Sequence, residues 1–305
     1  MSKEVEPKDL QSLLTSPSLR ALLQTQLAKL RFRIEYINQN IVSNVTALDK
    51  SLASLGYLLL FVTEAVKRLP LSSLVKSPLW GQLRILSGLI SDIRIFNRLW
   101  GMIPTAAWSL STWNSPPKDK IIKWITWLQI GTIYGFQPLE NVAYLMMKKI
   151  VRFQFAGTAN KEKRNDKLEL ALWLWSCRFW AAYVLLDFAK LYRNRQLRQL
   201  SLTEFNEAQL LKAKSRESEK DISKTKNRKA KLRESEEKAE FLHNLGLQKR
   251  ADIMSLVSNL SYLPLTIHWS LERGCCSDIM VGLLGFFGAC EVFPHWKTVY
   301  RGSPQ

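Results

Sequence analysis

The sequence has few of the residues from which catalytic and metal sites are usually built. Its 305 residues include four cysteines and three histidines, with no Cys-x-x-Cys pair and with the histidines far apart. It contains no Gly-rich phosphate loop, no His-Glu-x-x-His pair, no Gly-x-Ser-x-Gly elbow and no spaced carboxylate pair suited to acid–base catalysis. These absences predict that the protein is not an enzyme and uses no metal or cofactor. We interpret the four cysteines as buried structural thiols: Cys177, Cys275, Cys276 and Cys290.

Targeting signals and β-strand patterns are missing as well. Residues 1–7 contain acidic side chains and no apolar run, so we expect neither a secretory signal nor a mitochondrial presequence. Residues 301–305 do not resemble the Ser-Lys-Leu address of peroxisomal lumen proteins. No segment of useful length alternates apolar and polar residues, and no internal repeat is present. The sequence therefore predicts an all-α fold.

The charge is basic overall and unevenly distributed. The formal net charge is +18; residues 1–166 carry +11 and residues 190–250 carry +8, whereas residues 251–305 carry −1. The densest basic run, residues 212–238, also contains six acidic side chains and no aromatic one, unlike a nucleic-acid-binding surface. We therefore predict no nucleic-acid partner. We interpret residues 201–250 as a solvated, charged loop or helix that proteases can reach.

Helical periodicity and proline positions divide the chain into regions. Apolar residues three and four apart from Ile34 to Leu59 predict one helix, and a second helix should begin at Ser77-Pro78 and end before Pro104. A loop should follow to about residue 120, before helical blocks over 121–155 and 167–199. The predicted regions are an N-terminal helical region at 1–104, a central helical region at 105–200, the charged segment at 201–250 and a C-terminal apolar helical segment at 251–305.

Apolar segments are present, but none is a clean membrane span. Residues 168–188 have the length to cross a bilayer, yet they contain Glu169, Arg178 and Asp187, which cannot share one helix face. We expect this segment to pack among other helices or to lie shallowly in a membrane. The second candidate, 279–290, is only 12 residues long. Its glycines recur every third residue and would allow a close helix–helix contact: Gly282, Gly285 and Gly288. The sequence thus predicts a membrane-associated helical protein with amphipathic helices and one or two short hydrophobic segments.

The amphipathic segment over 79–103 carries the clearest functional signal. On a helical wheel, polar and small residues gather around Arg84, while the opposite arc is apolar and wide. Such a pattern is typical of a helix that lies in a membrane interface, and also of a core helix in a soluble bundle. The residues that we predict to bind membrane are Leu83, Arg84, Leu86, Leu89, Ile90, Ile93, Arg94, Phe96, Arg98 and Trp100. The arginines should meet anionic lipid and the apolar residues should wedge into one leaflet.

Four blocks, in order over most of residues 45–300, resemble the peroxin-11 family. The first runs from Trp80 through the Arg-Leu-Trp-Gly motif that ends at Gly101. The second contains Pro-Leu-Glu-Asn-Val at 138–142, where the family commonly has His in place of Asn141. The remaining blocks are similar to the family's first apolar segment at 176–188 and to its C-terminal block at 263–285. The charged stretch and the spacing are similar to the divergent fungal C-type branch.

The resemblance implies a non-enzymatic protein of the peroxisomal membrane. It implies membrane elongation and remodelling before peroxisome fission, through the amphipathic helix, and hence peroxisome proliferation. It also implies membrane lipid as a partner, self-association into a homo-oligomer, delivery by the peroxin-19 import receptor, and cooperation with a dynamin-like GTPase and a fission adaptor. Two alternatives stay open: a peroxisomal membrane pore or metabolite channel, and a soluble regulatory adaptor of the division machinery.

Overall fold

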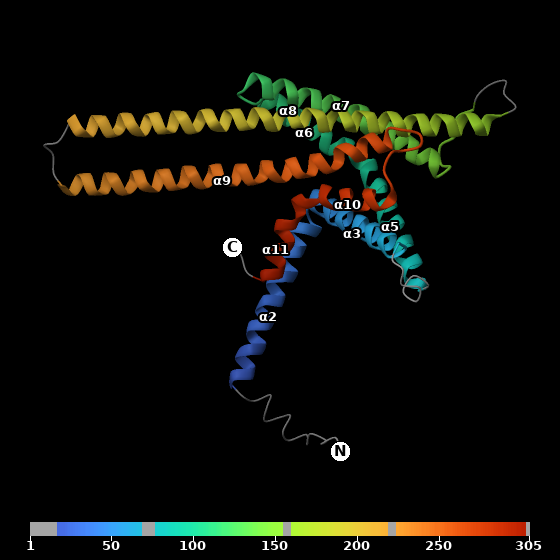
Figure 1. The fold of residues 1–305 in the computed structure, drawn as a ribbon, viewed down its shortest axis with the longest axis horizontal. Helices are drawn as coiled ribbons and strands as arrows, with labels where there is room; N and C mark the ends of the chain where they lie inside the picture. Colours follow the sequence, from blue (N-terminus) through green and yellow to red (C-terminus); the bar gives the residue numbers. More distant parts are fainter. Residues whose placement is uncertain (1–16, 69–76, 155–159, 219–223, 303–305) are drawn as a thin grey trace, which may run out of the picture.

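The computed structural model of the protein describes residues 17–68, 77–154, 160–218 and 224–302, and these are mostly helical. No strand occurs in these residues, so the predicted all-α fold is confirmed. Figure 1 shows a layer of long helices from which a shorter helical group and one projecting helix descend.

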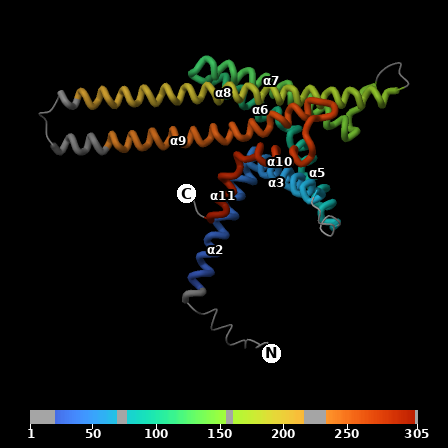
Figure 2. The backbone as a smooth tube through the Cα atoms, in the orientation of Figure 1, coloured from blue at the N-terminus to red at the C-terminus, as the bar shows by residue number. Residues whose placement is uncertain are grey.

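The long layer is built from α7 (Lys120–Met147), α8 (Lys161–Ser218) and α9 (Lys224–Trp269). α7 packs along α8, and α8 and α9 run side by side as an antiparallel hairpin (Figure 2). Near the far end of the hairpin the rings of Phe205 and Phe241 stack at 4.1 Å. The predicted blocks are helical, as expected, but their ends differ from the predicted ones. α8 extends beyond residue 199, because it pairs with α9 along the charged segment. That segment is therefore helical wherever the structure describes it, rather than a loop.

The N-terminal run is two helices and not one. α2 (Pro17–Ile37) leads into a π-turn, and α3 (Val45–Val66) begins anew after Asn44. The Asn44 side chain accepts a hydrogen bond from the backbone N–H of Ala47 at 3.1 Å, which is a helix N-cap. The apolar spacing continues across this break, so periodicity alone could not reveal it. α2 projects away from the molecule, and α11 (Phe293–Arg301) packs against it (Figure 1).

The amphipathic segment begins where the sequence predicts and then continues further. α5 (Pro78–Asn97) starts with Ser77 as its N-cap and proline at its first position. A 3-10 turn, Arg98–Trp100, joins it to α6 (Met102–Asn114). The predicted loop at 105–120 is confirmed only at 115–119, because α6 extends to Asn114 and Pro104 lies in its first turn, where proline costs no hydrogen bond.

The C-terminal segment returns to pack against the N-terminal region. α10 (Asp278–Gly288) lies along α3, and a short 3-10 turn connects it to α11. A Cβ atom at Gly282 would lie 2.6 Å from the backbone nitrogen of Phe61, and one at Gly285 would lie 2.3 Å from the ring of Tyr57. The close helix contact predicted from the glycine spacing is confirmed. The first and last predicted regions therefore share one packed interface.

Within the part of the chain that the structure describes, two helices are long and apolar enough to cross a membrane. They are α3, Val45–Val66, and the stretch Asp278–Arg301 that contains α10 and α11. The sequence-based candidate at 279–290 lies inside the second of these. The candidate at 168–188 instead lies within α8, which packs against α7 and α9; this agrees with the first of the two predicted alternatives, packing among other helices. The span at α3 was not predicted.

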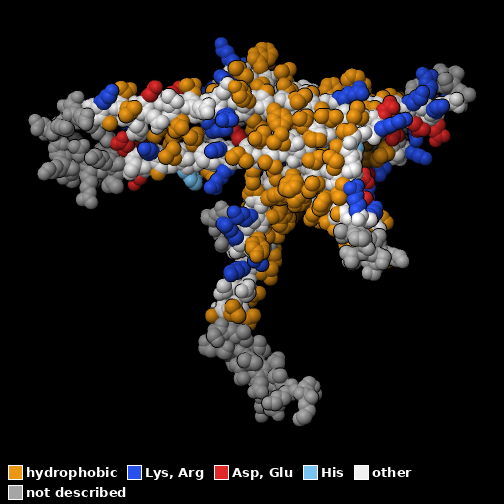
Figure 3. Space-filling view, viewed as in Figure 1, with side chains coloured by type: hydrophobic (Ala, Val, Ile, Leu, Met, Phe, Trp, Pro, Cys, Tyr) orange, Lys and Arg blue, Asp and Glu red, His pale blue; other side chains and the backbone are white. Residues whose placement is uncertain are grey.

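Many large apolar side chains are exposed, and the core contains polar side chains as well as apolar ones. Large apolar side chains are exposed on almost every helix, and those of Ile85, Trp113 and Trp124 are each more than 70% exposed. Orange apolar side chains cover the centre of the molecule in Figure 3. By contrast, Gln129 and Thr266 are fully buried. A large exposed apolar surface marks an interaction site. The two candidate spans indicate that the interaction is with a membrane.

The ion pair at the start of α7 yields a prediction about acid stability. Asp119 caps α7 by accepting from the N–H of Ile122 at 2.9 Å, and Arg193 of α8 donates to its carboxylate at 2.7 Å. The Arg193 hydrogen bonds, followed by the cap, lower the pKa of Asp119 from 3.8 to about 2. The charged form therefore stabilises the fold above pH 3.8, and this contribution is lost as the pH falls toward 2.

We expect Asp119→Asn, which keeps a cap acceptor, to melt below the wild type at pH 5. The difference should shrink as the pH approaches 2.5. Asp119→Ala, which loses the cap as well, should melt lowest at pH 5. Thermal melts of the full chain in detergent, followed by circular dichroism, test this order. A difference that does not depend on pH would contradict it.

Candidate membrane-binding surface

The outward face of α5 and the start of α6 form a continuous apolar surface. Its members occupy one arc of the helical wheel, and Trp100 and Ile103 are 65% and 70% exposed. We name this set the α5 apolar face: Ile85, Leu86, Leu89, Ile93, Phe96, Trp100 and Ile103. All seven of these residues are exposed in the part of the chain that the structure describes. The predicted apolar arc is thus mostly exposed, and its binding to membrane stays a prediction.

Two residues of the predicted arc point inward. Ile90 is 6% exposed and packs on Gly56 of α3, where a Cβ atom would lie 3.1 Å from the Ile90 side chain. Leu83 is half-buried. The neighbouring Ser87 donates a hydrogen bond to the carbonyl oxygen of Gly56 at 2.8 Å. Ile90 is therefore a packing residue, because the helix docks through the edge of the arc on which it lies.

Both arginines of α5 form ion pairs with neighbouring helices; the Arg84 side chain is 40% exposed, whereas that of Arg94 is largely buried. Arg94 donates to both carboxylate oxygens of Asp49 at 2.9 and 3.2 Å, and its side chain is 12% exposed. Arg84 lies 3.2 Å from Glu64 and 2.8 Å from Asp278. These pairs fasten both ends of α5 to α3 and to the start of α10. Each arginine thus has an acidic partner in the protein, and its binding to anionic lipid stays a prediction.

A buried polar cluster joins two of the blocks that resemble the peroxin-11 family. Arg98 lies 3.2 Å from Glu140 of α7, whose residue is only 4% exposed. Asn141 donates to the carbonyl oxygen of Leu99 at 3.3 Å. Burial raises the pKa of Glu140, and the nearby Arg98 partly offsets this rise. The Arg-Leu-Trp-Gly and Pro-Leu-Glu-Asn motifs are therefore halves of one contact between the α5–α6 junction and α7.

A second polar cluster holds the long layer together. Asp187 of α8 accepts hydrogen bonds from Gln129 of α7 at 2.9 Å and from Asn259 of α9 at 2.6 Å. Lys190 donates to the Gln129 oxygen at 3.3 Å. Arg178, the other charge in this part of α8, lies over the ring of Trp175 at 4.8 Å. Both charges were visible in the sequence, but the partners of Asp187 lie 58 and 72 residues away in the chain, so no local pattern could name them.

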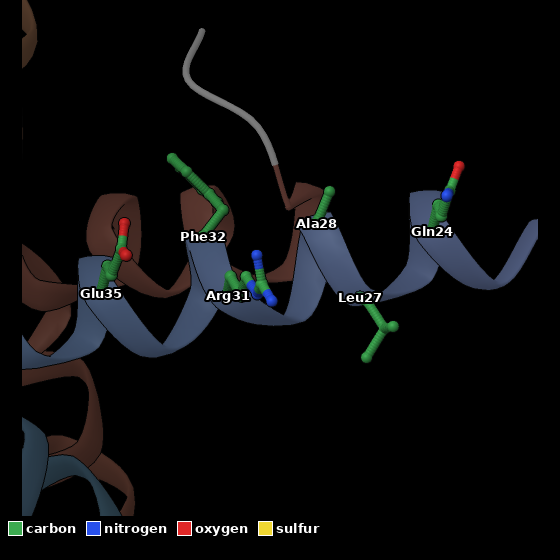
Figure 4. Close-up of a pocket in the computed structure, with 6 residues that line it drawn as sticks. All are labelled: Gln24, Leu27, Ala28, Arg31, Phe32 and Glu35. Atoms are coloured by element: carbon green, nitrogen blue, oxygen red, sulfur yellow. The ribbon is translucent and has the colours of Figure 1, made fainter. Parts of the chain in front are cut away.

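The surface also carries two hollows. A groove of about 720 Å³ runs between α8 and α9, with an apolar floor and with Arg195 and Lys249 among its lining residues. The other hollow lies on α2, and Figure 4 shows that all six of its lining residues come from this one helix. One helix face cannot enclose a ligand, so the α2 hollow is a surface feature rather than a binding site.

The cysteines depart from the prediction of buried thiols. Cys290 is buried, but Cys275 is exposed, and Cys276 and Cys177 are half-buried. The loop before α10 turns back so that Cys275 and Cys276 meet His268, which precedes them by seven and eight residues. Their backbone N–H groups donate to Nδ1 of the histidine. The absence of a familiar metal-ligand spacing therefore did not exclude a cluster of metal-ligating residues.

Comparison with known proteins leaves the family open. No protein-family model matches the chain, and no solved structure matches it. A Schizosaccharomyces pombe protein described as uncharacterized is 27% identical over 165 residues, which make up 54% of this chain and 54% of that protein. The chain thus spans about half the length of this relative. The resemblance to the peroxin-11 family stays a prediction.

Proposed function

We propose that this protein is a non-enzymatic peroxisomal membrane protein of the peroxin-11 type, which remodels the membrane before fission. The observation that carries the proposal is the orientation of α5. Its charged side is ion-paired to α3, α7 and α10, and its apolar side faces outward. A helix in a soluble protein would be expected to show the opposite arrangement.

The apolar face is large enough to drive insertion into lipid. It contains seven large apolar side chains, each of which contributes about 1.5–3 kcal/mol when it is fully removed from water. Insertion to half depth would still leave several kcal/mol in favour of the bound state. The helix is already folded and docked on α3, so no ordering cost offsets this gain.

The unit that enters the membrane is a group of three helices rather than α5 alone. α5 contacts α3 at Ser87–Gly56 and, at its two ends, through Arg84–Glu64 and Arg94–Asp49, so the two helices run antiparallel over most of their lengths. α10 packs on α3, one of the two helices that could span a membrane. In this proposal the three helices lie within one leaflet, so their bulk expands that leaflet and curvature follows from the area mismatch.

The decisive experiment places charges on the α5 apolar face without disturbing its docking. We expect Leu89→Glu with Phe96→Glu to abolish the tubulation of phosphatidylcholine–phosphatidylserine vesicles by the full chain. Both side chains are about half exposed, and a charge at the membrane centre costs about 2.5–3.5 kcal/mol. Because the apolar side chains of α3 and α10 remain, the variant should still sediment with the vesicles. Electron microscopy gives the readout.

The matched control is Leu210→Glu with Leu242→Glu, two exposed apolar residues on the arm formed by α8 and α9. It should tubulate vesicles like the wild type. Equal tubulation by both double variants would contradict the role of α5. Conductance in planar bilayers without any change of vesicle shape would instead favour the channel alternative.

The peroxisomal location has its own test. A tagged full chain should coincide with a peroxisomal marker, and the protein should stay with the membrane fraction in high salt, because apolar burial is not screened by ions. A purely cytosolic distribution, or complete release by high salt, would favour the soluble adaptor.

The tip of the arm should be dispensable for membrane association. Residues 212–240 have no apolar stripe to insert, and the ion pair Lys212–Glu237 that they contain is more than half exposed at both partners. We expect a chain with a short Gly-Ser linker in place of 212–240 to keep its membrane association and its tubulation activity. The stacked pair Phe205 and Phe241 remains to close the shortened hairpin. Sedimentation with vesicles measures the outcome, and release of the shortened chain would show that the arm binds the membrane.

A further inference from the structure

A cluster of three metal-ligating side chains lies in the loop that connects α9 to α10. His268 comes from the last turn of α9, while Cys275 and Cys276 lie just before α10. The donor atoms of all three lie within 4.8 Å of one another, and the two sulfur atoms are 3.9 Å apart. Two thiolates bound to one tetrahedral zinc ion, each at about 2.3 Å, lie about 3.8 Å apart. The sulfur atoms already have the separation that such an ion requires.

The loop is shaped around the imidazole ring. The backbone N–H groups of Cys275 and Cys276 both donate to Nδ1 of His268 at 2.8 Å, which directs this nitrogen toward the two cysteines. Gly274 has φ of +61°, and a Cβ atom there would lie 2.3 Å from the ring. Only glycine allows this close approach. Ring and loop therefore fix one another, and the donor set is largely arranged in advance.

We propose that His268, Cys275 and Cys276 bind a thiophilic divalent cation of the zinc class. Nδ1 and the two Sγ atoms supply three ligands, and the exposed side of the loop leaves the fourth position to water. On binding, Nδ1 exchanges its two N–H hydrogen bonds for one metal bond, and both thiols release their protons to solvent as the metal–sulfur bonds form. Two soft thiolates with one imidazole select zinc over magnesium or calcium.

The position of the site gives the cation a structural consequence. The loop leads directly into Asp278, which pairs with Arg84 of α5 and begins the second candidate span. A bound cation would fix the entry of this span relative to α9. Metal binding is independent of the proposed membrane function, because the cluster lies outside the α5 apolar face.

The test titrates Co²⁺, as a spectroscopic substitute for zinc, into the reduced full chain in detergent. We expect one Co²⁺ per chain, with an absorption band from thiolate-to-cobalt charge transfer, and displacement by Zn²⁺. Each single substitution of a ligand should weaken Co²⁺ binding by more than about tenfold: Cys275→Ser, Cys276→Ser and His268→Gln. Loss of a residue that only hydrogen-bonds to a ligand already weakens metal binding by about that factor. The controls Cys177→Ser and His243→Gln, away from the loop, should bind like the wild type.

Circular dichroism of each variant establishes that loss of binding is not loss of fold. Two results would overturn the proposal: a chain that gives no charge-transfer band at saturating Co²⁺, and a band of equal strength and affinity in the three site variants.

Discussion

Glu140→Leu is expected to destabilise the protein by about 3 kcal/mol, because it leaves the Arg98 guanidinium in a largely buried site without its carboxylate. The double variant Arg98→Leu with Glu140→Leu should recover most of this loss. Within the described residues, one oxygen of Glu140 and Nε of Arg98 have no hydrogen-bond partner, so the pair is imperfectly satisfied. Removing both groups therefore removes the unmet polar atoms together with the charges.

The single variant Arg98→Leu should respond to pH in a defined direction. Burial already raises the pKa of Glu140, and loss of the Arg98 charge removes the main opposing effect. The folded state would then hold the proton more tightly than the unfolded state. The stability that protonated Glu140 contributes should be fully present below its ordinary pKa of 4.5. It should be lost as the pH rises through the raised pKa of the folded state. The variant should thus be more stable at pH 5 than at pH 8.

Denaturation of the detergent-solubilised chain, arranged as a double-mutant cycle, measures both effects. Glu237→Leu is the matched control, since its partner Lys212 and Glu237 itself are more than half exposed. We expect that control to change stability by less than about 1 kcal/mol. A double variant as unstable as the sum of the singles would mean that Arg98 and Glu140 do not act as a pair.

Gly282→Ala should have the other large effect: it should lower the free energy of unfolding by about 2 kcal/mol or more. A Cβ atom at this position would lie 2.6 Å from the backbone nitrogen and 2.8 Å from the Cα atom of Phe61. Backbone atoms cannot rotate away, so α10 would have to separate from α3. Gly88→Ala is the matched control in another helix, because a Cβ atom there would meet no neighbouring atom within 4 Å.

The two alanine variants should therefore differ in sign. Gly88→Ala should stabilise the chain by about 0.5–1 kcal/mol, since alanine loses less conformational freedom than glycine in a helix. Thermal melts of both variants in detergent decide the matter. Equal stability of the two variants would show that α3 and α10 do not pack as closely as these distances require.

Several features of the fold could be predicted because they depend on neighbours in the chain. The start of α5 at Ser77 and Pro78 follows from the capping preferences of serine and proline. The close contact at Gly282 and Gly285 follows from the absence of side chains at a helical spacing. The boundary at Asn44 was missed because an N-cap competes with a continuing periodic pattern, and only packing decides which prevails.

The candidate site was predicted in its outline and not in its contacts. The apolar arc of α5 was visible on the helical wheel, because a helix repeats every 3.6 residues whatever surrounds it. The wheel could not say which edge docks, so it placed Ile90 on the membrane-binding arc and gave the arginines no partners in the protein. The acidic partners of these arginines lie between 20 and 45 residues away in the chain. They are Glu64 for Arg84, Asp49 for Arg94 and Glu140 for Arg98.

The sequence by itself determined that the protein is helical, that α5 has one wide apolar face, and that glycines allow α10 to approach another helix closely. Those properties come from local backbone preferences and from side-chain spacing within one helix. Only the tertiary structure decided which way the charged face of α5 turns, and that His268 meets Cys275 and Cys276 across a loop. The direction of the charged face depends on partners 20 and 45 residues away in the chain, and the histidine–cysteine cluster depends on how the loop between them turns, so helical periodicity specifies neither.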